Sequence, residues 1–277
     1  MCTLLDISNL EMNQYSGQSN EYSVFLNEDG RLCQEPNRRL KKIHKRIEIL
    51  FKRVNPPDYL HSVKGRSYVS NARIHSGKKA IAICDIEQFY PSTKYGHVYQ
   101  FFFEDLQCAK DVSTILSRIV CFQGHLPTGS PVSGQLAYFA HRGLFDQIYL
   151  MAQKEGIEFT LYVDDLSFSA DKVTPGFINH IRVLARKRGL ITHKERFFKK
   201  TDYKLLTGVG INAKGAVVLP NQRHKAIYDL MKATSRSTSN NTKDIERLLG
   251  RLNEAAQIDG SFSIRAKSIS EALKKRS

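Results

Sequence analysis

Three aspartates are the residues whose types and spacing most directly suggest chemistry. Asp85 follows the apolar run 79–84, and Asp164 and Asp165 stand side by side within the apolar stretch 159–169. Adjacent carboxylates among apolar neighbours are costly unless cations neutralise them. Two Mg²⁺ ions would do so, because Mg²⁺ prefers carboxylate and phosphate oxygens and an ion pair can clamp the attacking and leaving oxygens of phosphoryl transfer. The three aspartates are therefore predicted to be catalytic metal ligands.

The residue types alone do not decide which role each of the three aspartates has. Asp85 and Asp164 are the preferred bridging ligands, whereas the side chain of Asp165 would point to the other face of an extended strand. A bare Asp-Asp pair is more often a solvated hairpin turn, and this alternative stands at the level of the residues alone. Cys84 is predicted to be a buried apolar residue, since a hard Mg²⁺ site does not favour sulfur.

The charge balance indicates a polyanionic partner. The chain has 42 Lys and Arg against 27 Asp and Glu, a net charge of +15. Such a surplus favours nucleic acid through counterion release, although a basic surface without a partner is the alternative. The basic residues cluster in 38–53 and 194–204, which suits contact with phosphates but carries no sequence specificity.

Length and composition exclude several classes of protein. With 277 residues, 41% of them hydrophobic, the chain can form one large or two modest domains. It contains no run of about 18 apolar residues, so no membrane span is expected. Residues 1–20 lack the pattern of a signal peptide. The five cysteines are scattered without CxxC spacing, which predicts neither a zinc site nor disulfides and favours a cytoplasmic location.

Hydrophobic periodicity predicts a mixed α/β part followed by helices alone. Strands are expected at 21–26, 79–84, 204–211 and 216–219, with a β-hairpin at 159–169. Helices are expected at 38–54, 97–103, 112–122, 129–149 and 177–188. The predicted organisation is an arm at 1–20, a mixed part at 21–220 and a helical part at 221–277, with a loop at 234–242.

Three strings resemble the sequence boxes of reverse transcriptases. Tyr162-Val163-Asp164-Asp165 resembles their Tyr-x-Asp-Asp box, and 85–92 resembles the strand box with the first catalytic aspartate. Residues 126–133, Leu-Pro-Thr-Gly-Ser-Pro-Val-Ser, resemble the template-and-nucleotide box. All three occur in the family's order, so their joint occurrence is far more specific than the Asp-Asp pair.

Two further strings resemble those of bacterial retron enzymes in particular. Asn71-Ala72-Arg73-Ile74-His75 fits their Asn-Ala-x-x-His string, and Leu206-Thr207-Gly208 is close to their Val-Thr-Gly string. The resemblance covers roughly residues 21–225. It implies an α+β right-hand polymerase fold, with fingers and palm at 21–220 and a small, RNA-binding helical thumb at 221–277.

The resemblance also implies a reaction and partners. A retron-type reverse transcriptase would copy its cognate structured non-coding RNA (msr-msd) into branched msDNA, using dNTPs and two Mg²⁺ ions. An antiphage role with a separately encoded effector or toxin protein follows by association alone.

The resemblance assigns further roles to individual residues. Tyr90 matches the steric gate that excludes a 2′-hydroxyl, and Lys194 or Arg196 would assist proton transfer to pyrophosphate. The predicted nucleotide-binding residues are Tyr90, Arg66, Arg73, Lys78, Thr128, Gly129 and Lys194. The arginines and lysine before Asp85 are candidates for the triphosphate because guanidinium groups bind phosphates bidentately.

RNA contacts are predicted at both ends of the resemblance. The predicted RNA-binding residues are Asn71, His75, Arg223, Lys225, Arg247 and Arg251. Asn71 and His75 have an alternative as buried residues satisfied by hydrogen bonds. The basic residues after 221 have an alternative as plain surface.

Departures from the family pattern leave the metal ligands intact. Thr128 stands where many relatives carry Gln, Gly134 replaces a common Pro, and Val163 replaces a frequent Ala. Alternatives remain: another bacterial reverse transcriptase of the group II intron or diversity-generating type, a non-catalytic RNA-binding scaffold of polymerase fold, or a subunit that uses msDNA to silence a toxin. The Asn-Ala-x-x-His string disfavours the first and the intact aspartates the second.

Overall fold

The computed structural model describes residues 21–236 and 242–274. The predicted arm at 1–20 and part of the predicted loop at 234–242 lie outside these ranges. Residues 234–236 belong to a helix, so the loop prediction is wrong there.

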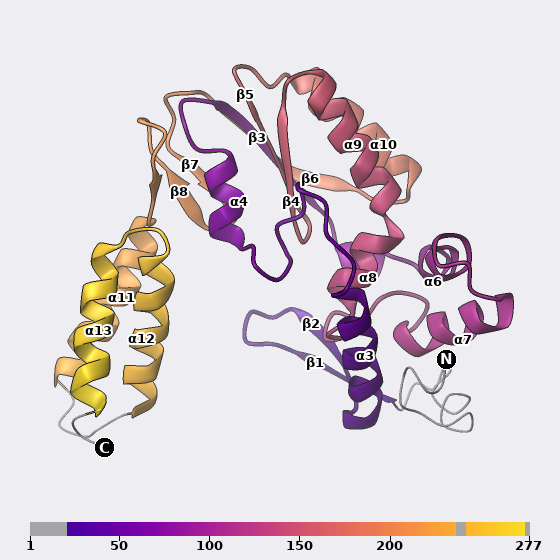
Figure 1. The fold of residues 1–277 in the computed structure, drawn as a ribbon, viewed down its shortest axis with the longest axis horizontal. Helices are drawn as coiled ribbons and strands as arrows, with labels where there is room; N and C mark the ends of the chain where they lie inside the picture. The colour runs from indigo at the N-terminus through magenta and orange to yellow at the C-terminus, as the bar shows by residue number, and fades with distance from the viewer. Residues whose placement is uncertain (1–20, 237–241, 275–277) are drawn as a thin grey trace.

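A four-stranded antiparallel sheet forms the centre of the molecule (Figure 1). Its order is β4 (Glu158–Tyr162), β5 (Asp165–Ala170), β3 (Ala80–Ile86) and β6 (Thr192–Phe198). Alternate side chains of β3 point to opposite faces. Ala82, Cys84 and Ile86 join the large hydrophobic core, whereas Ile81 joins a smaller one under α4. Asp85 therefore lies on the same face of the sheet as Ile81.

Helices cover both faces of this sheet. One side carries α9 (Arg142–Lys154) and α10 (Pro175–Lys187), and the other carries α4 (Tyr68–Ile74) (Figure 1). Phe168 of β5 packs edge-on against Phe177 of α10, with ring centroids 5.4 Å apart. Thr174 caps the start of α10 by accepting from the amide of Phe177.

A β-hairpin and several helices lie at one end of the sheet (Figure 1). The elements here are β1 (Tyr22–Leu26), β2 (Leu32–Pro36), α3 (Arg38–Phe51), α5 (Phe89–Ser92), α6 (Tyr95–Gln100), the π-helical turn η2 (Phe101–Asp105), α7 (Lys110–Val120) and α8 (Ser133–Ala140). Asn37 caps α3 by accepting from the amide of Leu40, and Leu40, Ile43 and Ile47 bury one face of that helix.

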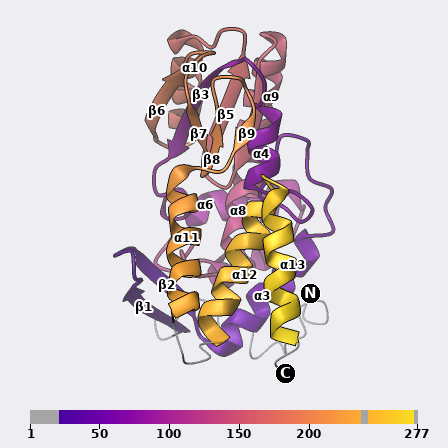
Figure 2. The ribbon, with the colours of Figure 1, turned by 90° about the vertical axis from the view of Figure 1, so that its left-hand side faces the viewer.

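A small sheet connects the central part to the C-terminal helices. It consists of β7 (Lys204–Leu206), β8 (Val209–Ile211) and β9 (Val217–Val218). The chain then forms α11 (Asn221–Arg236), α12 (Thr242–Ala256) and α13 (Ser261–Lys274), which stand side by side (Figure 2). These three helices share a separate hydrophobic cluster that includes Ile227, Leu248, Leu252 and Phe262.

Two sequence predictions of elements are wrong for identifiable reasons. The helix predicted at 129–149 is two helices, because Thr128 and Gly129 are bonded to β2 and the chain turns again at His141. The strand predicted at 204–211 is a hairpin, because Thr207 and Gly208 have φ values of +44° and +83°. Left-handed residues in a two-residue turn reverse the strand direction.

Within the described ranges, no helix combines the length and apolar character needed to cross a membrane.

Candidate active site

Two of the three predicted catalytic carboxylates lie side by side on neighbouring strands of the central sheet. Asp85 of β3 and Asp165 of β5 are direct partners in the antiparallel register. Directly opposite residues share a face of the sheet, and like charges in such positions destabilise the pair. The expectation that Asp165 would point away from Asp85 is therefore wrong.

The third carboxylate lies in a tight turn beside this pair. Val163 and Asp164 form the two-residue turn between β4 and β5, since Tyr162 pairs with Asp165. The Asp164 carbonyl accepts a hydrogen bond of 3.0 Å from the amide of Ile86, which ties the turn to the end of β3. Val163 has a φ of +60°, an uncommon conformation for a β-branched residue. Backbone strain of this kind persists only where the surroundings hold it, often at functional sites.

Burial and neighbouring carboxylates raise the pKa of Asp164 and of Asp165. Burial, followed by the charges of Asp164 and Asp85, raises the pKa of Asp165 to about 6. Burial and the charge of Asp85 also raise the pKa of Asp164, opposed by nearby Lys194 and Arg31. Raised pKa values of this kind are expected where carboxylates are held close together despite their mutual repulsion.

A bulge in β6 brings two nitrogen groups to Asp85. His193 Nε2 lies 2.9 Å from Asp85 Oδ2, and Lys194 Nζ donates to the same oxygen at 2.8 Å. The register of β3 with β6 shifts between Ile83 and Asp85, and Lys194 has a φ of +52°. Bulges redirect side chains in this way. Of the two candidate proton donors, Lys194 is at the carboxylates, whereas Arg196 is opposite Ile83.

Arg182 of α10 fixes the neighbouring residue of the same bulge. Its guanidinium donates to both carboxylate oxygens of Glu195, at 2.7 Å and 2.6 Å from one nitrogen. This bidentate pair has a defined geometry. It holds Glu195 against α10 and so helps to fix the backbone from which Lys194 reaches Asp85.

Tyr90, predicted to bind the nucleotide, lies near enough to Asp164 to feel its charge. Burial and the charge of Asp164 raise the pKa of Tyr90 to about 12. A Cβ atom on Gly134 would lie 3.4 Å from the Tyr90 hydroxyl oxygen, so the small residue in α8 leaves room for this ring. Phe89 is buried in the core instead, where it packs against Phe145.

Of the three predicted triphosphate ligands, Arg73 and Lys78 are not brought to the carboxylates, whereas Arg66 lines a cavity beside Tyr162 and Val163. Arg66 donates to the carbonyls of Pro57, Asp58 and Leu60 in its own loop. Arg73 donates to the carbonyl of Gln257. Lys78 precedes the other end of β3, roughly 20 Å from Asp85 at the rise of an extended strand.

Arg31 is the basic residue that sequence reasoning missed. It ends the turn of the β1–β2 hairpin, is exposed, and its charge lowers the pKa of Asp164. Its position fifty-four residues before Asp85 gave no local signal, because the hairpin reaches the site only through tertiary packing.

Thr128 and Gly129 hold that hairpin. Thr128 Oγ1 donates to the carbonyl of Leu32 at 2.8 Å and accepts from the amide of Gln34 at 3.1 Å. The amide of Gly129 donates to the Gln34 carbonyl at 3.1 Å, and a Cβ on Gly129 would lie 2.8 Å from that oxygen. The close backbone approach predicted at Gly129 is therefore made by β2.

Asn71 and His75 are fully buried. His75 Nδ1 lies 2.7 Å from Ser169 Oγ, and its Nε2 lies 2.7 Å from Thr160 Oγ1. Asn71 Nδ2 donates to Thr207 Oγ1 at 3.4 Å. Both side chains are buried, away from any surface that RNA could reach. His75 is hydrogen-bonded through both ring nitrogens, whereas Asn71 bonds only through Nδ2, and its Oδ1 has no hydrogen-bond partner in the described part of the chain.

Three of the four predicted RNA-binding residues after 221 gather at one pocket. Arg223, Arg247 and Arg251 line a cavity of about 430 Å³ between α11 and α12, together with Glu254. Lys225 is exposed elsewhere on α11. A cavity with three guanidinium groups has the chemistry of a phosphate site.

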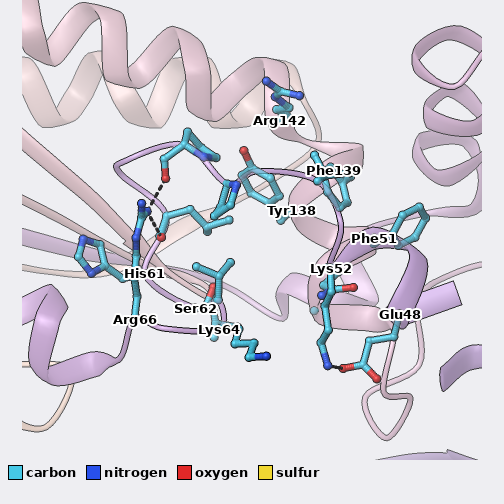
Figure 3. A pocket seen from close by; sticks show the side chains of 18 of the residues that line it. Glu48, Phe51, Lys52, His61, Ser62, Lys64, Arg66, Tyr138, Phe139 and Arg142 are labelled. Atoms are coloured by element: carbon cyan, nitrogen blue, oxygen red, sulfur yellow. Dashed lines mark hydrogen bonds and ion pairs between the residues drawn. The ribbon is translucent and has the colours of Figure 1, made fainter. Parts of the chain in front are cut away.

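A larger cavity adjoins the aspartate hairpin. Its volume is about 480 Å³, and Tyr162 and Val163 belong to its wall. Figure 3 shows the basic side chains that line it, which are Lys52, Lys64, Arg66 and Arg142. Tyr138 and Phe139 of α8 add aromatic surface. Cations with aromatic rings suit a nucleic acid strand.

The carboxylate set fits a divalent metal by its chemistry. Asp85, Asp164 and Asp165 offer hard oxygen ligands whose mutual repulsion a cation would relieve. In the described part of the chain, no three or more His, Cys, Asp or Glu side chains converge closely enough to form a finished metal site. Lys194 and His193 instead share the Asp85 carboxylate.

Comparison with solved structures identifies the fold as that of reverse transcriptases and telomerases. The foamy viral protease-reverse transcriptase in complex with double-stranded DNA matches with a TM-score of 0.54 and 18% identity, over 91% of this chain and 38% of that one. Apo telomerase from Candida tropicalis matches with a TM-score of 0.53 and 9% identity, over 75% and 55%. The predicted α+β polymerase fold is confirmed.

Comparison with curated proteins confirms the resemblance to retron reverse transcriptases. The Retron Se72 reverse transcriptase of Salmonella heidelberg is 32% identical over 121 residues, covering 43% of this chain and 32% of that protein. The Retron Ec86 reverse transcriptase of Escherichia coli is 34% identical over 110 residues, covering 40% and 34%. The matched region thus spans about a third of these relatives. No family model matches the chain.

Proposed function

We propose that this protein is an RNA-directed DNA polymerase of the retron type. The observation that carries the proposal is the meeting of Asp85, Asp165 and the turn residue Asp164 at one edge of the polymerase-type sheet. By the family resemblance, the template would be a cognate structured non-coding RNA and the product branched msDNA; the similarity to two proteins named retron reverse transcriptases supports the class of enzyme. By the same analogy, a separately encoded effector protein and an antiphage role belong to the proposal.

The three aspartates would hold two Mg²⁺ ions. When bound, the ions would stabilise the attacking hydroxyl and the leaving pyrophosphate during nucleotidyl transfer. Lys194 is placed to hold a proton near Asp85, because its ammonium group already donates to that carboxylate. The hydrogen bond and charge of Asp85 raise the pKa of Lys194, so the ammonium group holds its proton firmly while it is paired with that carboxylate.

The surrounding residues would bind and orient the deoxynucleotide. Tyr90 would pack against the sugar and exclude a 2′-hydroxyl. Arg31 takes the place of Arg73 and Lys78 as a proposed triphosphate ligand beside Arg66, because it is an exposed arginine whose charge acts on Asp164. Thr128 and Gly129 act through β2, which carries the hairpin, and not by touching the nucleotide.

The two cavities provide the proposed path of the nucleic acid. The template strand would pass the cavity beside Tyr162 and Val163, and the duplex backbone would meet Arg223, Arg247 and Arg251. A-form duplexes are bound by shape and backbone, which suits exposed guanidinium groups on helices.

The experiment that tests the proposal is DNA synthesis by the purified protein. It is supplied with its neighbouring non-coding RNA, dNTPs and Mg²⁺, beside the double variant Asp164→Asn, Asp165→Asn and the exposed control Asp105→Asn. A branched, ribonuclease-sensitive DNA from wild type and control alone supports the proposal.

Two outcomes would overturn parts of it. Extension of an ordinary RNA/DNA primer-template without use of its own RNA would indicate another class of reverse transcriptase. RNA binding with no DNA synthesis under either condition would favour the non-catalytic scaffold.

A further inference from the structure

The helix α4 touches three separate parts of the molecule. His75, which follows its last turn, contacts the hairpin that carries Asp164 and Asp165, through Thr160 of β4 and Ser169 of β5. Asn71 contacts Thr207 in the β7–β8 turn. Both side chains are fully buried, so these contacts are part of the packed interior.

The first turn of α4 meets the C-terminal helices. Tyr68 donates a hydrogen bond of 2.5 Å to Glu254 Oε1 of α12. Arg223 of α11 donates to both partners, at 3.0 Å to the Tyr68 hydroxyl and 2.8 Å to Glu254 Oε1. The Arg223 guanidinium also lies over the Tyr68 ring, 5.0 Å from its centroid. A second bond joins Arg73 to the carbonyl of Gln257.

The β7–β8 turn is built to admit this cluster. Thr207 Oγ1 donates to the carbonyl of Tyr68 at 3.2 Å. A Cβ on Gly208 would lie 2.8 Å from Arg223 Nη2, so a larger residue would displace the guanidinium. The strings 71–75 and 206–208 are thus two sides of one junction, although more than a hundred residues separate them in the chain.

We propose that α4 is a positioning element that holds the C-terminal helices in a fixed orientation to the aspartate hairpin. The Tyr68 hydroxyl, bonded to Glu254 and Arg223, is the contact that transmits this positioning; Tyr68, Arg223 and Glu254 form what we call the α4 junction. The inference rests on the proposed function, because the orientation matters if a duplex lies on those helices while its end is extended at the carboxylates.

The physical consequence is a separation of two properties. The junction contacts do not involve Asp85, Asp164 or Asp165, so their loss should leave the carboxylates and the chemistry of one addition unchanged. The C-terminal helices, however, keep their own hydrophobic cluster and would move as a unit. A duplex held at a variable angle dissociates more often between additions.

The test uses Tyr68→Phe in the full-length protein, which removes one oxygen and leaves the ring under Arg223. The matched control is Tyr149→Phe. Tyr149 belongs to α9, and its hydroxyl accepts a hydrogen bond of 2.6 Å from Gln153 Nε2, which is not part of the junction. Both are assayed on an RNA template with a DNA primer, with excess heparin as a trap after initiation.

For Tyr68→Phe we expect the KM for primer-template to rise about three- to tenfold, as for loss of one hydrogen bond of typical net strength. The DNA made per encounter should shorten, while kcat for a single added nucleotide stays within about twofold. Glu254→Gln should have the same effect, and the double variant should be no worse than the stronger single one. A parallel fall of kcat, additive effects, or an equal change in Tyr149→Phe would overturn the inference.

Amide hydrogen exchange gives a readout that does not need catalysis. Tyr68→Phe should exchange faster in the first turn of α4 and in α12 near Glu254, while β3 and β5 remain as protected as in wild type. Unchanged exchange at the junction would reject the positioning role even in an active enzyme. Absence of DNA synthesis by the wild-type protein would instead count against the proposed function, and the exchange result would still stand.

Discussion

The two ends of the central sheet carry polar side chains in opposite conditions. At one end, Asp85 and Asp165 face each other and repel, and the pKa of Asp165 is raised to about 6. At the other end, both ring nitrogens of His75 have hydroxyl partners at 2.7 Å. Asp164 and Asp165 would be stabilised by a cation added to the site, whereas His75 already has its hydrogen-bond partners within the protein. The contrast distinguishes residues that would bind a ligand from residues that hold the fold together. Both kinds belong to the family's sequence strings, so the sequence alone does not tell them apart.

The contrast also gives opposite dependences on pH. The pKa of Asp165 in the folded protein lies above its ordinary value of 3.8, so its contribution lowers stability as the pH rises through the window from 3.8 to about 6. Burial lowers the pKa of His75 from 6.5 to about 3, so its contribution is lost as the pH falls from 6.5 towards 3. Each end can therefore be tested by its own titration.

The largest effect is expected from removing the charge of the acidic end. Asp165→Asn should reduce DNA synthesis about 10³-fold or more, as for other essential catalytic groups. The same variant should be more stable than wild type at pH 7, because the raised pKa shows that the charged form is penalised in the folded state. Urea unfolding at pH 4 and pH 7 measures this, and the gain should shrink at pH 4.

Mg²⁺ supplies the control for that prediction. Because the ion binds the folded site, it should raise the melting temperature of wild type with the logarithm of its concentration above the Kd, and raise that of Asp165→Asn much less. A variant that is less stable than wild type at pH 7, or that gains equally from Mg²⁺, would mean that the carboxylates are held by favourable contacts and not poised for a cation.

Substitution of Lys194 should have opposite effects on two properties: it should slow DNA synthesis and strengthen Mg²⁺ binding. Lys194→Met should slow DNA synthesis about 10²-fold, the scale of a lost general acid. It should also tighten Mg²⁺ binding, because the ammonium no longer competes for Asp85 Oδ2. Lys200→Met is the matched control, since Lys200 pairs with Asp171 at 2.8 Å on the surface. Weaker Mg²⁺ binding in Lys194→Met would show that Lys194 supports the site and does not compete with the ion.

The two ends differ in how far the sequence predicted them. The aspartates were found because their boxes are local, and the strand before Asp85 and the hairpin around Asp164 were both placed correctly. Arg31 and the pairing of Thr128 with β2 were missed, because they depend on a hairpin folding back over the site. The burial of Asn71 was left as an alternative, since a short polar string is equally compatible with a surface and with a satisfied interior.

The β6 bulge shows the same limit in one strand. The run 192–198 contains four charged or His residues and was not predicted as a strand, because it lacks the apolar alternation of a half-buried strand. Its place at the sheet edge and the pairing of Glu195 with Arg182 explain why such a sequence is extended. The direction of Lys194 depends on the bulge, which residue types alone do not specify.

Substitution of His75, at the hydrogen-bonded end of the sheet, should change the stability of the protein. His75→Leu leaves the hydroxyls of Thr160 and Ser169 without their partner, so the free energy of unfolding should fall by about 1–3 kcal/mol at pH 7. The variant should also lose less stability than wild type between pH 6.5 and pH 4, because it lacks a group that must stay neutral when buried. His180→Leu on the exposed face of α10 is the control. Steeper acid unfolding in His75→Leu would contradict the assignment of a neutral, buried His75.

The smallest effect is expected from substitution of Thr128, a residue of the fold that would act on nucleotide binding through the β1–β2 hairpin. Thr128→Val removes the hydroxyl that bonds Leu32 and Gln34 while keeping the shape, so the β1–β2 hairpin should hold Arg31 less firmly. The KM for dNTP should rise about two- to fivefold, as for one neutral hydrogen bond, and Thr128→Ser should restore it. If Thr128 acts through the hairpin, Arg31→Ala should hide the effect of Thr128→Val in the double variant. Additive effects would mean that Thr128 contacts the nucleotide directly, which would move it from the architectural side of the comparison to the binding side.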